Sequence, residues 1–270
     1  MKLKELMKLA FEKCESNDLE IEAVKKLLIE LKYQSAAKFL MAYNDEVEEE
    51  IIDKVSLYLD KQIPVQYILG YTYFYGLKFR VNDSVLIPRY DTEVLVEEAI
   101  KEIKANDYKR CLDLCTGSGA IAISVCKNTD AKVYASDISK DALDVAIRNN
   151  HEIGTSVEFI ESDILTNIDY QFDIILSNPP YISYNEDVDK IVRENEPHLA
   201  LFAKEDGLYF YRKILEEIKE KQKNIKMIIF EIGYKQADEI AKITNNIFSN
   251  ASIVVIKDYA GRDRVLKISL

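Results

Sequence analysis

The spacing of apolar residues divides the 270-residue chain into three regions, and the first, residues 1–62, is typical of helices. One apolar face recurs at helical spacing: Leu3, Leu6, Met7, Ala10 and Cys14. Asn17, with Glu20 three residues later, predicts the start of a second helix, and Asn44 or Asp45 that of a third. We therefore expect a small, all-helical N-terminal domain at residues 1–62.

The second region, residues 63–88, is rich in aromatic and branched side chains punctuated by Gly70 and Gly76. This pattern predicts a short hairpin that links two domains. A helix is expected to follow at Asp91, capped by Asp91 or Thr92.

In the third region, residues 89–270, short apolar runs alternate with helical stretches such as Lys140–Asn150 and Gly207–Lys221. The predicted strands are Arg110–Cys115, Lys132–Asp137, Val157–Asp163, Phe172–Ser177, Lys226–Ile232, Ile253–Tyr259 and Val265–Ser269. This alternation predicts an α/β fold with a mostly parallel sheet covered by helices on both faces. Ligands in such folds bind beyond the carboxyl ends of the strands.

A glycine loop, DLCTGSGAIA at residues 113–122, follows the first of these strands. Gly117 and Gly119 allow a tight turn and let the backbone approach a ligand. Asp137 ends the second strand and can accept hydrogen bonds from two ribose hydroxyls. The loop alone also satisfies the relaxed pattern of NAD enzymes. Asp113 favours S-adenosylmethionine instead, because a carboxylate there suits a positive sulfur and repels a pyrophosphate.

The end of the third strand offers a further contact for an adenosine group. Asp163 can accept from the exocyclic amine of adenine, or Ile164 can pack against the ring. Both residues are therefore candidates for cofactor binding.

The segment SNPPYIS, residues 177–183, follows the fourth strand and predicts a socket for a planar amine. The side-chain oxygen of Asn178 and the carbonyl of Pro179 can accept both hydrogens of an –NH₂ group. The two prolines, Pro179 and Pro180, restrict the backbone, so these acceptors have little freedom. Tyr181 can stack on a flat amide or base.

Such an arrangement favours methyl transfer to an amide or aromatic nitrogen. The nitrogen is a poor nucleophile, and holding both of its hydrogens out of plane helps it attack a methyl group. Alignment of reactants can lower a barrier by about 7–11 kcal/mol. Asn178, Pro179 and Tyr181 are therefore the expected catalytic residues.

Charge and composition restrict the class of protein. The net charge is −11, and a protein that grips nucleic acid usually has a basic excess, so direct nucleic-acid binding is not expected. The four cysteines and two histidines lack zinc-site spacing, and we expect no metal. No apolar block typical of a signal peptide or membrane span is present, so a cytoplasmic protein is the expectation. We also expect a monomer.

The chain resembles the HemK/PrmC family, the N5-glutamine methyltransferases of peptide chain release factors. The resemblance covers nearly the whole length. Its motifs are PVQYILG (64–70), FYGLKF (74–79), LIPRYDTE (86–93), DLCTGSGAIA (113–122), SNPPYIS (177–183), EPHLALFAKEDGLYFYRKI (196–214), EIGYKQ (231–236) and DYAGRDRV (258–265).

The resemblance implies a Rossmann-like, seven-stranded class I methyltransferase domain that methylates the glutamine of the GGQ motif in class 1 release factors. It implies cofactor contacts from Cys115, Thr116, Gly117, Ser118 and Gly119, from Asp137, and from the Asp163–Ile164 corner, with Asn178 beside them. Asn178, Pro179, Pro180 and Tyr181 are implied to bind the target glutamine. The helical domain is implied to help dock the release factor.

Two positions depart from the family pattern, Cys115 where glycine is frequent and Tyr90 where proline is frequent. Arg89 could reach the cofactor carboxylate or form a surface salt bridge. Arg262 and Arg264 are expected to pair with acids of the C-terminal sheet. An adenine methyltransferase of nucleic acid, or a noncatalytic adapter that binds the cofactor, would use the same motifs.

Overall fold

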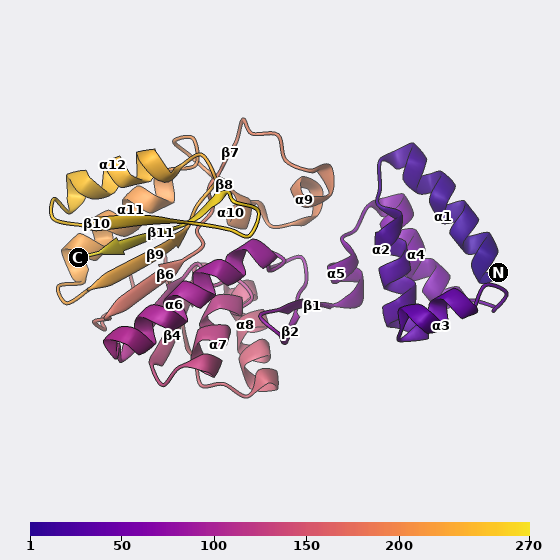
Figure 1. Ribbon diagram of the computed structural model, residues 1–270, viewed down its shortest axis with the longest axis horizontal. Coiled ribbons are helices and arrows are strands. Elements are labelled where there is room, and N and C mark those ends of the chain that lie inside the picture. The colour runs from indigo at the N-terminus through magenta and orange to yellow at the C-terminus, as the bar shows by residue number, and fades with distance from the viewer. The chain divides into compact units, whose positions relative to one another are not determined.

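Two units, each with its own apolar core, make up the computed structural model, which describes residues 1–270 (Figure 1). The first unit comprises Met1–Tyr71 and Val188–Asn195. Its helices are α1 (Leu3–Asn17), α2 (Ile21–Leu28), the π-helical turn η1 (Ile29–Tyr33), α3 (Ala36–Met41), α4 (Glu49–Lys61), α5 (Val65–Leu69) and α9 (Lys190–Asn195). The predicted apolar face is buried at Leu3, Leu6, Ala10 and Cys14.

Two predicted helix starts in this unit are wrong. Asn17 ends α1, and α2 begins after Glu20, whose backbone N–H donates to the Tyr58 hydroxyl of α4 at 3.0 Å. Asp45 does not cap a helix either, because its carbonyl accepts from Leu3 and the chain then extends to the cap at Glu48. In both places a contact from another element replaces the local cap.

The second unit comprises Thr72–Asp187 and Glu196–Leu270 and contains the predicted sheet. Its seven strands are β3 (Arg110–Leu114), β4 (Lys132–Asp137), β5 (Glu158–Glu161), β6 (Ile174–Ser177), β9 (Met227–Glu231), β10 (Ser252–Lys257) and β11 (Asp263–Ser269). Their order is β10-β11-β9-β6-β3-β4-β5, and only β11 runs antiparallel to both of its neighbours. The predicted strands and the mostly parallel sheet are confirmed.

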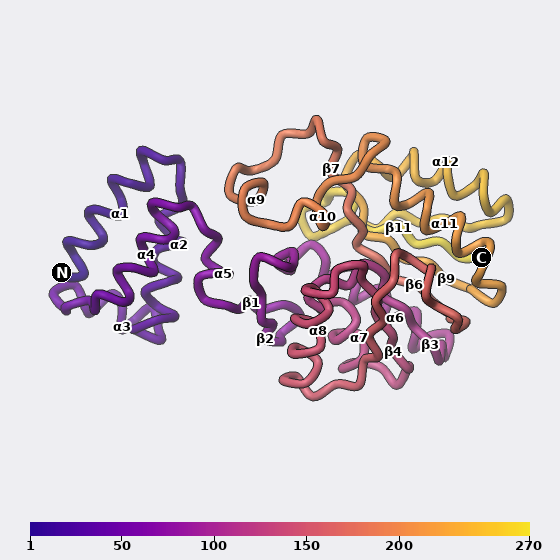
Figure 2. The backbone as a smooth tube through the Cα atoms, turned by 180° about the vertical axis from the view of Figure 1, so that it is seen from behind, coloured from indigo at the N-terminus to yellow at the C-terminus, as the bar shows by residue number.

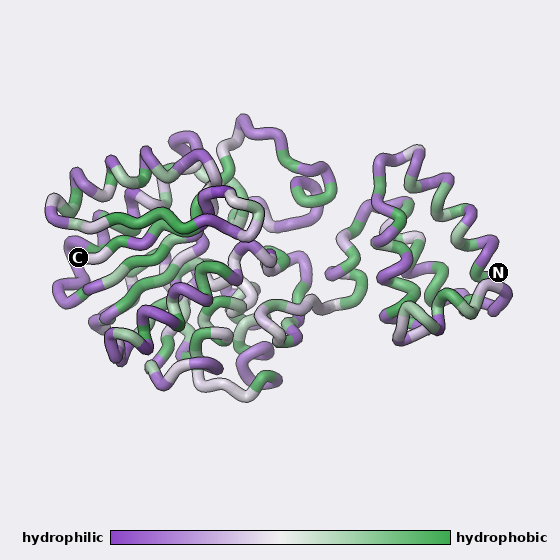
Figure 3. Tube along the Cα trace, viewed as in Figure 1, coloured by the Kyte–Doolittle hydropathy of each residue, from purple (hydrophilic) through white to green (hydrophobic).

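Helices cover both faces of this sheet, as Figures 1 and 2 show from opposite sides. One face carries α6 (Glu93–Asn106), α7 (Ala120–Asn128) and α8 (Lys140–Ile153), and the other α11 (Tyr209–Lys221) and α12 (Ala237–Ile247). Each face has its own buried cluster. Much of the sheet is apolar, whereas α11 and α12 alternate between polar and apolar residues, as amphipathic helices do (Figure 3).

The strand order reverses between β3 and β6, and this fixes where the two sequence motifs meet. From β3 the chain moves outward through β4 and β5, then returns to β6 on the other side of β3. Leu114 and Ser177 pair at the carboxyl ends, and the Ser177 hydroxyl donates to the Leu114 carbonyl at 2.8 Å. The glycine loop and the SNPPY segment therefore begin side by side at the position where such sheets bind ligands.

The segment predicted as a hairpin linker contains α5, the hairpin strands β1 (Tyr71–Phe74) and β2 (Leu77–Arg80), and an extended stretch that leads to the short helix η2 (Tyr90–Thr92). After SNPPY the chain forms β7 (Ile182–Ser183), which pairs in parallel with β8 (Phe202–Ala203) just after α10 (His198–Leu201). Between these strands Val188–Asn195 belongs to the first unit, where Asn195 donates to the Gln62 carbonyl at 3.0 Å.

Candidate active site

The glycine loop closes tightly over the start of α7. The backbone N–H of Thr116 donates to the Ser136 carbonyl at 3.0 Å, and that of Gly119 to the Thr116 carbonyl at 2.9 Å. Gly119 has φ +81°, and a Cβ there would lie 2.9 Å from Cδ1 of Ile123. At Gly117, with φ +54°, a Cβ would meet nothing within 4 Å, so the backbone faces open space there.

Two aspartates, Asp113 and Asp137, accept hydrogen bonds from residues of this loop. Oδ2 of Asp113 accepts from the Thr116 hydroxyl at 2.6 Å and from the Ala122 N–H at 3.2 Å. Oδ1 of Asp113 is buried without a partner, and burial raises the pKa of this carboxyl to about 7. Asp137 accepts from the N–H groups of Gly117 at 2.8 Å and Ser139 at 2.9 Å, while burial raises its pKa.

A cavity of about 310 Å³ opens above the carboxyl ends of the strands. Most of the predicted site residues line it: Cys115, Thr116, Gly117, Ser118, Asp137, Asp163, Ile164, Asn178 and Pro180. Asp113, Gly119, Pro179 and Tyr181 are not among its lining residues. The structure thus brings the glycine loop, the ends of β4, β5 and β6, and the SNPPY segment to one cavity.

The two acceptors predicted for an –NH₂ group are unpaired. Nδ2 of Asn178 contacts the Thr92 hydroxyl at 3.5 Å, whereas no protein donor reaches Oδ1. The Pro179 carbonyl likewise accepts no hydrogen bond from the protein. Both oxygens therefore keep their lone pairs, although Pro179 is not among the residues that line the cavity.

Tyr181 turns toward the end of β9 and away from the cavity lining. Its hydroxyl donates to Oε1 of Glu231 at 3.3 Å, and burial raises the pKa of Tyr181 well above its ordinary value. Its backbone carbonyl accepts from Nε2 of Gln236 at 3.0 Å, while Oε1 of Gln236 accepts from the Gly233 N–H. Tyr181 therefore anchors the SNPPY segment, and its stacking on an amide stays a prediction.

Two basic residues line the cavity, Arg89, for which the sequence left two roles open, and Lys213, which the sequence did not single out. Arg89 lines the cavity and pairs with the buried carboxylate of Glu196, which also accepts from the Ile87 N–H at 3.0 Å. Lys213 of α11 lines it too and donates to Oδ2 of Asp163 at 2.6 Å. A single arginine or lysine in a polar sequence context does not indicate which acid it meets.

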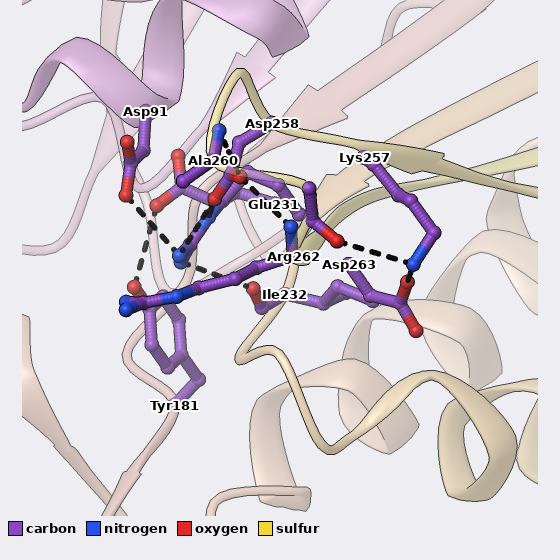
Figure 4. A network of polar contacts seen from close by, with 11 residues as sticks. Asp91, Tyr181, Glu231, Ile232, Lys257, Asp258, Ala260, Arg262 and Asp263 are labelled. Atoms are coloured by element: carbon purple, nitrogen blue, oxygen red, sulfur yellow. Dashed lines mark hydrogen bonds and ion pairs between the residues drawn. The ribbon is translucent and has the colours of Figure 1, made fainter.

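The C-terminal arginines differ from each other. Arg264 pairs as predicted with an acid next to the C-terminal strands, Asp258, at 3.3 Å, and it also pairs with Asp91 of η2 at 3.1 Å. Figure 4 shows both acids. For Arg262 the prediction is wrong, because its guanidinium lies over the Tyr234 ring at 5.9 Å from the centroid. Stacking on an aromatic face offsets the loss of an acidic partner.

Comparison with known proteins identifies the family. Residues 90–200 match the model of the methyltransferase small domain. The release factor glutamine methyltransferase of Lactococcus lactis subsp. lactis (strain IL1403) is 39% identical over 92% of this chain and 93% of its own length. That of Bacillus subtilis (strain 168) is 39% identical over 86% and 90%.

The chain belongs to the release factor glutamine methyltransferase family. The resemblance noted from the motifs is thereby confirmed, and the positions that carry those motifs include most of the residues around the cavity.

Comparison with solved structures shows which fold the chain shares. The ribosomal protein L11 methylase of Lactobacillus delbrueckii subsp. bulgaricus aligns with a TM-score of 0.50 at 21% identity, over 71% of this chain and 84% of that one. A methyltransferase from Pyrococcus furiosus aligns with a TM-score of 0.53 at 18% identity, over 73% and 89%. These alignments show a shared fold, and the predicted seven-stranded class I methyltransferase domain is confirmed.

Proposed function

We propose that this protein transfers a methyl group from S-adenosylmethionine to the side-chain amide nitrogen of the glutamine in the GGQ motif of class 1 release factors. Family membership supports the reaction and the substrate. The observation that carries the proposal is the pair of unpaired acceptors, Oδ1 of Asn178 and the Pro179 carbonyl, on the segment next to the glycine loop.

The residues around the cavity fit the cofactor. Asp137 is held in place by two backbone N–H groups and retains lone pairs for ribose hydroxyls. The backbone at Gly117 faces open space, so a ligand can approach it closely. The cavity volume lies at the lower end of the range for small-molecule sites, about 300–1,000 Å³. S-adenosylmethionine, when bound, supplies a methyl group on a positively charged sulfur.

We assign the cofactor contacts to Cys115 through Gly119, Asp137, Asp163 and Ile164, with Asp113 beneath the loop. Asp163 already accepts from Lys213, so this lysine orients the carboxylate that would meet an adenine amine. Ile164 is buried at the cavity wall with φ +51° and presents an apolar surface for the ring.

The protein's part in the reaction is to select and orient the amide. Asn178 and Pro179 accept both hydrogens of the –NH₂ group, which leaves the nitrogen lone pair free to attack. A substrate group without two hydrogens would leave an acceptor unpaired at a cost of about 1–3 kcal/mol. No strong base is required, because the proton can leave after the methyl group has been transferred.

The remaining assignments follow from the same proposal. We propose that residues 1–62 form a docking domain for the release factor, that 63–88 form a linker and that 89–270 form the catalytic domain. The net charge of −11 supports a protein substrate over nucleic acid. No helix is both long and apolar enough to cross a membrane. We place the enzyme in the cytoplasm as a monomer.

The test is a methylation assay with purified protein, a class 1 release factor and S-adenosylmethionine labelled in its methyl group. Mass spectrometry should locate the label on the GGQ glutamine, and a release factor in which this glutamine is replaced by glutamate, which has no –NH₂ group, should stay unlabelled. Nucleic acid is included in a parallel reaction. Label on nucleic acid alone, or on no macromolecule, would overturn the proposal.

A further inference from the structure

The SNPPY segment is attached at both of its ends, and the second attachment is the side chain of Gln236. At the first end the Ser177 hydroxyl donates to the Leu114 carbonyl at 2.8 Å. At the second end Nε2 of Gln236 donates to the Tyr181 carbonyl at 3.0 Å. The two prolines between these ends have no N–H with which to form a further backbone hydrogen bond. The position of the Pro179 carbonyl therefore depends on the two attachments.

Backbone groups determine which way round the Gln236 amide lies. Its Oε1 accepts from the N–H of Gly233 at 3.0 Å, which an amide nitrogen cannot do. Its Nε2 then faces two backbone carbonyls, that of Tyr181 at 3.0 Å and that of Asp206 at 3.4 Å. A reversed amide would lose all three hydrogen bonds. One side chain thus joins the loop after β9, the SNPPY segment and the turn before α11.

The turn that Gln236 contacts has an unusual backbone. Glu205, Asp206 and Gly207 are three consecutive residues with positive φ, at 58°, 51° and 87°. This left-handed conformation is unfavourable for residues other than glycine, and such strain is concentrated at functional sites. A Cβ on Gly207 would lie 2.1 Å from the Tyr181 carbonyl oxygen and 2.5 Å from Nε2 of Gln236. The strained turn therefore packs directly against the end of the segment that carries the acceptors.

We propose that Gln236 is a positioning residue, which together with the turn at residues 205–207 holds the Tyr181 carbonyl and so places the two acceptors for the target –NH₂ group. The inference rests on the proposed function and adds to it a residue that does not line the cavity. The acceptors belong to Asn178 and Pro179, and the fixed φ of the prolines transmits a shift of the Tyr181 carbonyl to them. A misplacement of about 1 Å is enough to slow a reaction between aligned groups.

Gln236→Glu tests this role, because the two side chains have the same shape and the new carboxylate only accepts. The variant keeps the bond from the Gly233 N–H and loses both bonds to the carbonyls. A negative charge also suits the start of α12, where Gln236 is the N-cap, so a loss of activity does not arise from a less stable helix. We expect kcat to fall at least about tenfold at pH 8. Kd for S-adenosylmethionine and KM for a release factor should stay within about threefold.

Gln171→Glu is the matched control. The Gln171 amide forms the same kind of bridge, in which Oε1 accepts from the Lys223 N–H at 3.0 Å and Nε2 donates to the Lys221 carbonyl at 2.8 Å. Gln171 is partly buried, like Gln236, and it does not line the cavity. We expect its kcat to stay within about twofold of that of the unmodified enzyme. Urea unfolding establishes that each variant is folded under the assay conditions.

The pH dependence of Gln236→Glu supplies a second measurement. Once protonated, the new carboxyl has an O–H that can donate to the Tyr181 carbonyl, and the carbonyl oxygens that face it favour this protonated form. Asp206 is a neighbouring charge that acts in the same direction, whereas the charge of Lys235 lies over the Tyr234 ring. The ratio of unmodified to variant kcat should therefore shrink at least about threefold between about pH 8 and pH 5.5.

Gln236→Met, which has no proton to donate at any pH, should lose kcat at least about tenfold and should not recover in acid. A kcat within threefold of the unmodified enzyme in Gln236→Glu, an equal loss in Gln171→Glu, or a kcat ratio that does not change with pH would overturn the inference. An unmodified enzyme that leaves the release factor unmethylated would instead overturn the proposed function.

Discussion

Glu196 and Arg89 form an ion pair at the edge of the cavity in which the carboxylate is buried and the guanidinium is partly exposed. Glu196 also accepts the Ile87 N–H, so it joins the stretch before η2 to the segment that follows α9. This geometry differs from an exposed salt bridge, because the acid cannot turn to water if its partner is lost.

We therefore expect Glu196→Ala to lower the free energy of unfolding by about 2 kcal/mol, because it leaves the Ile87 N–H unpaired and removes the partner of Arg89. Glu152→Ala, which removes the exposed partner of Arg80, should cost no more than about 0.5 kcal/mol. Urea unfolding measures both. Equal losses in the two variants would contradict the role of Glu196.

Asn178→Ala tests the acceptor pair. Loss of Oδ1 leaves one hydrogen of the target –NH₂ group unpaired, which costs about 1–3 kcal/mol and lowers turnover roughly 5- to 150-fold. Affinity for S-adenosylmethionine, measured by calorimetry, should stay within about tenfold. Asn185→Ala, an exposed change in the loop after β7, is the matched control. Normal turnover in Asn178→Ala would rule out the acceptor pair.

Gly207 packs closely against the backbone of the SNPPY segment at Tyr181. It has φ +87°, and a Cβ would lie 2.1 Å from the Tyr181 carbonyl oxygen. Gly207→Ala should therefore displace the segment and lower turnover at least about tenfold, by the sensitivity of oriented reactants to small shifts. Gly154→Ala, with φ +72° and no atom within 4 Å of the added Cβ, should cost about 1–2 kcal/mol of stability but keep turnover.

The departure at Cys115 has a conformational cost. Cys115 adopts φ +59°, a left-handed conformation that favours glycine. Cys115→Gly and Cys115→Ala both remove the sulfur, and they differ in this preference. We expect the glycine variant to be more stable than the alanine variant by about 1 kcal/mol, the reverse of the usual order within helices. Thermal unfolding of the two variants provides the comparison. A more stable alanine variant would show that the left-handed backbone at residue 115 does not favour glycine.

The raised pKa of Asp113 predicts a pH dependence of stability. In the unfolded chain this carboxyl loses its proton near pH 3.8, whereas in the folded protein it holds the proton up to about pH 7. The folded state therefore binds more protons between these values, and stability falls as the pH rises through this window. Asp113→Asn has no carboxyl to lose a proton at this position. The free energy of unfolding of this variant, relative to that of the unmodified protein, should therefore increase from pH 4 to about 7.

Urea unfolding at several pH values measures this difference. The exposed Asp130→Asn is measured beside it as the control. Parallel curves for Asp113→Asn and the unmodified protein would show that Asp113 does not hold a proton in the folded state.

The succession of strands and helices along the chain could be predicted from the sequence, because apolar alternation and turn residues are local signals. The rule that ligands bind beyond the carboxyl ends of parallel strands then placed the glycine loop and SNPPY at one site. Glu231 lies near the end of the predicted strand Lys226–Ile232 and is the last residue of β9. Its contact with Tyr181, 50 residues away, arises only when β9 and β6 pair. The start of α2 could not be predicted either, because it also depends on a residue distant in the sequence. The backbone N–H of Glu20 donates to the hydroxyl of Tyr58.

The assignment of Val188–Asn195 to the first unit has a practical consequence for anyone who wishes to produce the catalytic half alone. Deleting residues 1–71 would remove the apolar side chains that Ile191 packs against. It would also remove the Gln62 carbonyl, which accepts a hydrogen bond from Asn195. We therefore expect a catalytic fragment to need a second change, in which a short polar loop replaces Val188–Asn195.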